Sequence, residues 1–142
     1  MKYSKKIINH FQNPRNVGEI KNADGVGEVG NLRCGDVMRV FIKINTRKLK
    51  AKSDKLETEE EYIEDIKFKT LGCAAAIAAS SIMTEIAKGK SLDDAYKISR
   101  DDINDLLGKL PAQKYHCSIL SASAIKKAID DYREKSNKKN QK

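Results

Sequence analysis

The sequence has no tryptophan and only two prolines, and aromatic residues make up 6% of its 142 residues. No apolar run approaches the roughly 20 residues that a membrane-spanning helix needs. Residues 1–8 pass directly into a polar, helical pattern and lack the apolar stretch and cleavage site of a secretory signal. We therefore expect no membrane segment and a cytoplasmic location.

The excess of positive charge is concentrated near the C-terminus. The formal net charge is +8 and the isoelectric point is about 9.3, a balance that often indicates nucleic-acid binding. From Arg133 to Lys142, however, five basic residues stand against Glu134 alone. We expect residues 133–142 to form a disordered basic tail after a single domain at 1–132, with no binding of nucleic acid.

Hydrophobic periodicity predicts strands in the first half of the chain. Residues 37–44 and 62–69 alternate between apolar and charged side chains, which is typical of half-buried strands. Before them, residues 18–35 contain five glycines and are expected to form turns and a mobile loop. Between the two strands, residues 45–61 carry five basic and five acidic residues and few large apolar ones, so they predict an elongated hairpin tip or loop.

The second half of the chain has the spacing of helices. Residues 75–86 carry an apolar stripe at helical intervals, and Gly89 supplies a stop. Capping signals follow at Ser91 and Ser99, and a last helix is expected from about Ser118. The predicted fold class is α+β, with helices packed on one face of a small antiparallel sheet.

The three cysteines are an odd number, so they cannot all form disulfides within one chain. In a reducing compartment such cysteines are metal ligands, nucleophiles or buried core residues. Cys34 ends the glycine-rich stretch, Cys73 stands where the second strand gives way to a helix, and Cys117 opens the final helix. A helix N-terminus favours thiolate, the form that binds metal and attacks sulfur.

Asp36 and His116 are the candidate fourth ligands. Three thiolates with an imidazole or a carboxylate suit an iron–sulfur cluster or zinc. The intervals of 39 and 44 residues between the cysteines match no short zinc signature. Spacing alone therefore leaves open that the cysteines are buried core residues, that Asp36 is a turn or cap residue, and that His116 is an exposed loop histidine.

Four separated motifs carry a resemblance to a known family. They are Asn9–Gly18, Cys34–Met38, Phe68–Cys73 and His116–Leu120, and they occur in the family's order. On these motifs the chain resembles the IscU/NifU-N family of iron–sulfur cluster assembly scaffolds from Tyr3 to about Tyr132. The resemblance implies a three-stranded antiparallel sheet with helices packed on it.

The resemblance also implies the site and its cargo. Cys34, Cys73 and Cys117 would hold a transient [2Fe-2S] cluster, with Asp36 and His116 as exchangeable partners and zinc in the cluster-free form. Cys117 would accept persulfide sulfur from a cysteine desulfurase of the IscS/NifS type, and the cluster would pass to apo iron–sulfur proteins. Such a scaffold has no turnover reaction of its own. The resemblance leaves a homo-oligomer open.

A physical argument also favours Cys117 as the sulfur acceptor. It stands at the start of a helix, beside His116 and near Lys114, where positive charge stabilises thiolate. Cys73 enters an alanine-rich packed helix, so we expect it to be less accessible, and Cys34 on its loop is the main rival as sulfur acceptor.

Two departures from the family pattern bear on partners. The charged insertion 45–61 is longer than the hairpin turn of the bacterial scaffold. It lies away from the cysteines in sequence, so we expect it to be an addition to the domain that does not abolish function. Residues 110–114 read Leu-Pro-Ala-Gln-Lys where many members have Leu-Pro-Pro-Val-Lys, the segment read by a dedicated Hsp70-type chaperone. That partnership is therefore left open.

Two other functions compete with the scaffold. A zinc-dependent sulfur acceptor resembling SufU would use the same cysteines and aspartate. SufU-type chains carry their insertion between the second and third cysteines and lack the histidine before the third, whereas this chain has its insertion before Cys73 and retains His116. A cysteine hydrolase using Cys117 with His116 is disfavoured, because adjacent residues rarely align as nucleophile and base.

Overall fold

The computed structural model describes residues 3–31, 36–49, 58–108, 110 and 114–140. The elements of this part of the chain are, in order, α1 (Lys5–Gln12), β1 (Gly25–Asn31), β2 (Asp36–Leu49), β3 (Thr58–Leu71), α2 (Ala74–Ala87), α3 (Leu92–Tyr96), α4 (Arg100–Leu107) and α5 (Tyr115–Asn140). None of the helices in these residues is long and apolar enough to cross a membrane.

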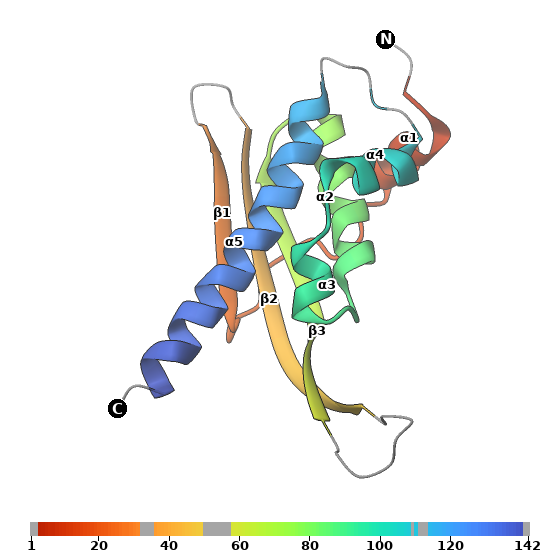
Figure 1. The fold of residues 1–142 in the computed structure, drawn as a ribbon. Coiled ribbons are helices and arrows are strands. Elements are labelled where there is room, and N and C mark those ends of the chain that lie inside the picture. Colours follow the sequence, from red (N-terminus) through yellow and green to blue (C-terminus); the bar gives the residue numbers. More distant parts are fainter. Residues whose placement is uncertain (1–2, 32–35, 50–57, 109, 111–113, 141–142) are drawn as a thin grey trace.

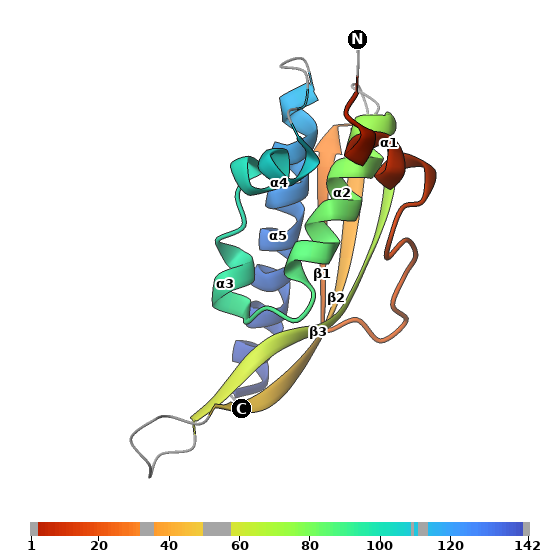
Figure 2. The same cartoon turned by 90° about the vertical axis from the view of Figure 1, so that its right-hand side faces the viewer.

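The strands form one antiparallel sheet in the order β1-β2-β3. Helices α2 and α5 lie side by side against one face of this sheet, and α3 and α4 extend the same layer (Figures 1 and 2). The side chains of Met38, Val40 and Ile42 on β2 point into the space between sheet and helices and are almost fully buried. The predicted α+β class is confirmed.

A shift in strand register keeps the inner face of β3 apolar. Ile66 pairs with Ile42, but the next apolar residue, Ile63, pairs with Ile44 because the register slips by one residue. Side chains alternate along a strand, so without this bulge Glu64 would face the core. Instead Ile63 and Ile66 are both fully buried and Glu64 is exposed.

The first strand lies where the sequence predicted turns and a mobile loop. Gly25 and Gly27 are on the face of β1 that contacts α5, and a Cβ atom on Gly27 would overlap the backbone of Ala124 and Ala128. The inner face of β1 is therefore largely backbone, which allows α5 to approach closely. The prediction for residues 25–31 was wrong because this strand lacks the alternating large apolar residues on which strand prediction depends.

Replacing Gly27 by alanine tests this close approach. Glycine to alanine ordinarily favours a strand slightly, but here the added methyl group must push α5 away from β1. We expect a loss of about 1–3 kcal/mol in the free energy of unfolding, measured by urea denaturation. Glu28→Ala, on the outer face of the same strand, is the control and should cost no more than about 1 kcal/mol. A Gly27→Ala protein as stable as the parent would show that the approach is not tight.

The N-terminal segment closes the free edge of β3. Helix α1 begins after Ser4, whose hydroxyl accepts a hydrogen bond from the Ile7 amide, as the sequence predicts. Beyond α1 the chain runs along β3, where the Gly18 amide donates to the Phe68 carbonyl and the Phe68 amide donates to that of Asn16, both at 2.9 Å. The edge is thereby partly protected from pairing with other chains.

The later helices begin and end at the predicted signals. Ser99 and Asp102 form a reciprocal capping box at the start of α4, and Gly108 ends that helix in the left-handed conformation with φ of 73°. Ser91 caps α3 by accepting a hydrogen bond from the Asp94 amide. Helix α2 differs from its predicted single stripe because it is buried on most of its surface.

Strands β2 and β3 continue beyond the sheet as a two-stranded arm, which projects from the body of the domain (Figure 2). Both strands are longer than predicted, and part of the insertion is therefore strand, while residues 50–57 lie outside the described residues. At the base of the arm Arg47 forms an ion pair with Glu60 at 2.8 Å and lies 4.7 Å above the ring of Tyr62. It also donates a hydrogen bond to the Gly89 carbonyl at 3.0 Å, which anchors the arm to the helical layer.

The arm can be shortened without unfolding the domain. Arg47 and Glu60 are directly opposite in the register, so the residues between them can be replaced by an Asn-Gly turn. We expect the free energy of unfolding to change by less than about 1 kcal/mol, since loop-closure entropy varies slowly with length. The same shortened chain with Arg47→Ala should be less stable, because the anchor to Gly89 is lost. Failure of the first variant to fold would mean that the removed residues support the core.

Helix α5 continues through most of the predicted tail. It extends to Asn140, so the expectation of a disordered end from Arg133 was wrong over this range. Just before these residues the helix is attached to the sheet: the Asp131 carboxylate accepts a hydrogen bond from the Val26 amide at 2.9 Å, and the Tyr132 hydroxyl donates to Glu61. Burial and the Glu61 carboxylate raise the pKa of Tyr132 to about 12.

Candidate metal centre

Two of the three cysteines meet at one end of the domain. Cys73 is the residue that precedes α2, in extended conformation, and Cys117 lies in the first turn of α5. Both are reduced thiols, and their sulfur atoms are 3.9 Å apart. The contact forms because α2 and α5 pack side by side with their N-termini at the same end of the sheet (Figure 1).

The distance between these sulfur atoms suits a shared metal ion. Two thiolates bound to one tetrahedral metal at about 2.3 Å are about 3.8 Å apart. The 3.9 Å between Cys73 and Cys117 therefore needs almost no adjustment for both to bind the same iron or zinc ion.

The remaining predicted ligands are placed only in part. His116 is exposed, and its Nε2 atom lies 3.6 Å from the Cys117 sulfur. Asp36 begins β2 next to Val37, which pairs with Leu71 at the end of the sheet that leads into Cys73, but its side chain is not described. Cys34 lies outside the described residues.

A complete ligand set is not visible in the part of the chain that the structure describes. Within those residues no group of three or more His, Cys, Asp and Glu side chains is arranged to hold a metal ion. The pair of thiols with the neighbouring imidazole is what the fold brings together, and the predicted participation of Cys34 and Asp36 stays a prediction.

The two thiols differ in their surroundings. Burial raises the pKa of the Cys73 thiol, but the amide groups of Ala76 and Ala75, the Cys117 thiol and the Lys114 ammonium outweigh it, so that the pKa lies below its ordinary value. The Lys114 Nζ atom is 3.6 Å from the Cys73 sulfur. In turn, the charge of the Cys73 thiolate raises the pKa of Lys114.

Accessibility is the reverse of the expectation from sequence. Cys117 is 0% exposed, whereas Cys73 is half-buried. Cys117 faces the core from the first turn of α5, while Cys73 stands in the junction before its helix begins. The expectation that Cys73 would be the less accessible thiol was therefore wrong, and the assignment of Cys117 as the sulfur acceptor stays a prediction.

A further contact fixes the first turn of α5. The Ser118 hydroxyl donates a hydrogen bond to the Asn104 side chain on α4 at 2.6 Å, and Ser118 is fully buried. The sequence offered only a weak signal for this contact, namely a serine next to the last cysteine. The residue adds a second attachment for the turn that carries His116 and Cys117.

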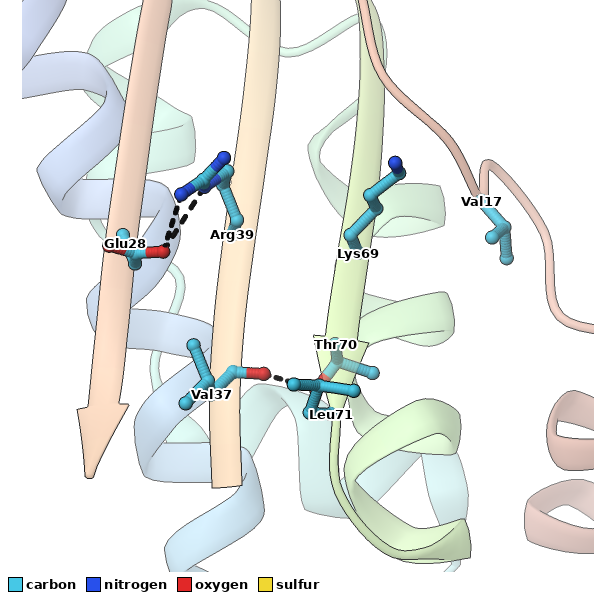
Figure 3. Close-up of a pocket in the computed structure, with 7 residues that line it drawn as sticks. All are labelled: Val17, Glu28, Val37, Arg39, Lys69, Thr70 and Leu71. Carbon is cyan, nitrogen blue, oxygen red and sulfur yellow. Dashed lines mark hydrogen bonds and ion pairs between the residues drawn. The ribbon is translucent and has the colours of Figure 1, made fainter. Parts of the chain in front are cut away.

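A shallow hollow lies on the sheet face opposite the helices, and it reaches the residues that precede the site (Figure 3). Its lining consists of Val17, Glu28, Val37, Arg39, Lys69, Thr70 and Leu71. Glu28 accepts two hydrogen bonds from Arg39, so this charged pair is internally satisfied. Leu71 is 69% exposed although it is only two residues from Cys73, which leaves apolar surface beside the thiols.

The fold and the site together define a class of protein: a small α+β domain that presents closely spaced reduced thiols, one of them activated, at one end of its sheet. Residues 2–139 match the family model described as NifU-like N terminal domain. The chain belongs to this family, which confirms the resemblance seen in the sequence.

Relatives and solved structures agree with this membership. The chain is 53% identical over 136 residues to "Iron-sulfur cluster assembly scaffold protein IscU 1" of Archaeoglobus fulgidus, covering 96% of this chain and 80% of the relative. It is 50% identical over 138 residues to "Iron-sulfur cluster assembly scaffold protein IscU" of Escherichia coli K12, covering 95% and 97%. The fold is similar to the crystal structure of a putative scaffold protein for the SUF system from Fervidobacterium islandicum, with a TM-score of 0.65, 24% identity and coverage of 89% and 96%.

Removing the charge of Lys114 tests the activation of Cys73. In Lys114→Gln the thiolate loses a positive neighbour, so we expect the pKa of Cys73 to rise and its alkylation at neutral pH to slow. The measurement is the rate of iodoacetamide labelling of Cys73 against pH in the metal-free protein, followed by mass spectrometry. Lys127→Gln, an exposed lysine farther along α5, is the control.

The same pKa shift fixes the direction of a stability change. Because the folded-state pKa of Cys73 is lowered, the thiolate contacts stabilise the fold above the pKa of the unfolded thiol, and this contribution is lost as the pH falls through the folded value. An unchanged labelling profile in Lys114→Gln would show that the amide groups and the Cys117 thiol lower the pKa without the lysine.

Proposed function

We propose that the chain is a scaffold for the assembly of iron–sulfur clusters. It receives sulfur from a cysteine desulfurase, binds iron, holds a transient [2Fe-2S] cluster and transfers the cluster to apoproteins. The observation that carries the proposal is the 3.9 Å contact between the sulfur atoms of Cys73 and Cys117, which belong to separate elements. Membership of a family whose relatives are named as IscU scaffold proteins supports it.

The proposed ligands are the three cysteines, with one exchangeable position. Cys73 and Cys117 bind one iron atom, and Cys34 with Asp36 or His116 binds the other. Thiolates are the ligands that iron–sulfur clusters require, whereas a carboxylate or imidazole is a weaker match for cluster iron. A mixed set of this kind favours a cluster that is held and then released.

Sulfur transfer follows the chemistry of thiol–disulfide exchange. A scaffold thiolate attacks the outer sulfur of the desulfurase persulfide, the old S–S bond breaks, and the desulfurase cysteine leaves as thiolate. An external reductant must then supply two electrons for each persulfide sulfur that becomes sulfide. We assign the acceptor role to Cys117, which requires its turn to open because the thiol is buried, and Cys73 is the rival with the more accessible, activated sulfur.

The partners follow from this role. Sulfur donor and cluster acceptor are proteins that must dock beside the thiols, and the exposed side chains of Leu71 and Tyr115 offer apolar contact there. The partnership with a chaperone stays open, because the segment departs from the family pattern and Pro111, Ala112 and Gln113 lie outside the described residues. Two reduced thiols in contact suit a reducing compartment such as the cytoplasm.

Zinc is the proposed occupant of the cluster-free site. Zinc binds the same tetrahedral set of thiolates and imidazole, and the spacing of the Cys73 and Cys117 sulfur atoms suits zinc as well as iron. A protein that kept only zinc and relayed sulfur would be a SufU-like acceptor. The scaffold differs from it in that an iron–sulfur cluster forms on the protein and is passed on. The scaffold is a carrier without a turnover reaction of its own.

Anaerobic reconstitution with iron and sulfide tests the function. We expect charge-transfer absorbance, two iron and two sulfide per chain, and transfer of the cluster to an apo-ferredoxin. Cys34→Ser, Cys73→Ser and Cys117→Ser should each lose most of the absorbance, because each removes a thiolate ligand. Ile63→Val, which trims the core near the arm and far along β3 from Cys73, is the control and should load fully.

One result would count against the scaffold function, and another would change only the ligand assignment. Zinc retained through reconstitution, with no cluster formed but with desulfurase activity stimulated, would favour the SufU-like function. Full loading of any one cysteine variant would remove that cysteine from the ligand set while leaving the scaffold function in place.

A further inference from the structure

Three buried side chains meet where β2, α2 and α5 pack together. The Ser80 hydroxyl lies 3.1 Å and the Ser121 hydroxyl 3.3 Å from the thioether sulfur of Met38, and the two hydroxyl oxygens are 3.5 Å apart. Ser80 and Ser121 are 0% exposed and Met38 is 1% exposed. We call these three residues the hydroxyl–thioether cluster.

Packing alone does not explain the hydroxyl groups. Much of α2 around Ser80 is alanine, so alanine at this position would suit the same space without a polar atom to bury. Burying a hydroxyl costs free energy unless it is hydrogen-bonded, and a thioether is only a weak acceptor. Each hydroxyl therefore needs its second partner, which is a carbonyl group one turn earlier in its own helix.

Those carbonyl groups belong to the turns that carry the thiols. Ser80 donates to the Ala76 carbonyl at 2.8 Å, and the amide of Ala76 is one of the two that lower the pKa of Cys73. Ser121 donates to the carbonyl of Cys117 itself at 3.1 Å. Each serine thus fixes the first turn of one helix at the metal centre.

The thioether adds the third element. Met38 is two residues beyond Asp36 on β2, the strand that follows Cys34. The cluster therefore joins, in one buried contact, the three elements that carry or follow the three cysteines.

We propose that Met38, Ser80 and Ser121 are positioning residues that hold the ligand-bearing elements in register beneath the metal centre. They touch neither metal nor substrate, and they act through the turns of Cys73 and Cys117 and through the start of β2. This inference rests on the proposed function, because it gives the hydroxyl–thioether cluster a role in retaining the iron–sulfur cargo. Loss of the hydroxyl–thioether cluster lets the sulfur atoms of Cys73 and Cys117 move apart, so the iron–sulfur cargo is released sooner.

The test compares variants of the hydroxyl–thioether cluster with matched controls. Met38→Leu keeps the volume and removes the sulfur, while Ser80→Ala and Ser121→Ala remove one hydroxyl each. Met83→Leu is the control for the first, since Met83 is equally buried on α2, and Thr84→Val removes another buried hydroxyl of the same helix. Each protein is loaded anaerobically with iron and sulfide, and its visible circular dichroism and cluster lifetime under a chelator are recorded beside the melting temperature of the apo form.

We expect each variant of the hydroxyl–thioether cluster to shorten the cluster lifetime by about tenfold, as changes behind metal ligands do, and to alter the circular dichroism. The controls should keep the parent lifetime and spectrum even where they lower the melting temperature as much. In a double-mutant cycle, Met38→Leu combined with Ser80→Ala should shorten the lifetime of the iron–sulfur cluster by less than the product of the two single fold-changes, because both substitutions disrupt one contact.

Cobalt binding separates this inference from the proposed function. Co²⁺ in a tetrahedral thiolate site has visible absorption that reports ligand geometry, so it measures the positioning effect without an iron–sulfur cluster. Parent protein that binds Co²⁺ but never forms a cluster would refute the scaffold function alone. Lifetimes and Co²⁺ spectra that follow the melting temperature equally in variants and controls would refute the positioning role and leave the scaffold function intact.

Discussion

The approach of α5 to β1 determines the arrangement of the rest of the molecule. Because Gly25 and Gly27 present no side chain to the helix, α5 lies on the backbone of the strand and leaves room for α2 beside it. Two helices can then share one face of a narrow three-stranded sheet, with both N-termini at the same end. The meeting of Cys73 with Cys117 is a consequence of this packing.

The two thiols meet but are not equivalent. Cys73 precedes its helix and interacts with two first-turn amides and a lysine ammonium, so its thiolate is favoured and partly accessible. Cys117 lies inside the first turn of its helix and faces the core. The pair therefore combines a partly accessible sulfur whose thiolate is favoured with a sulfur that the core shields.

The charged arm and the thiols lie at opposite ends of the same two strands. The pair of Val37 with Leu71 is next to Cys73, whereas the pair of Leu49 with Thr58 is at the far end of the hairpin. The arm is anchored to the body through Arg47 and is not part of the thiol site. This separation explains how the domain can carry an enlarged hairpin while the geometry around the thiols is preserved.

The sequence by itself determined the fold class, the helix caps at Ser4 and Ser99, and the positions of Cys73 and Cys117 at the starts of helices. These features depend on local spacing and on short-range hydrogen bonds. It did not reveal β1, since the strand's inner face is glycine and only the helix packed against it shows why. It also placed the greater accessibility on Cys117, whereas burial against the core is decided by contacts between elements distant in the chain. The tertiary structure alone decided the 3.9 Å spacing of Cys73 and Cys117, because that distance depends on how two separate helices pack on one sheet.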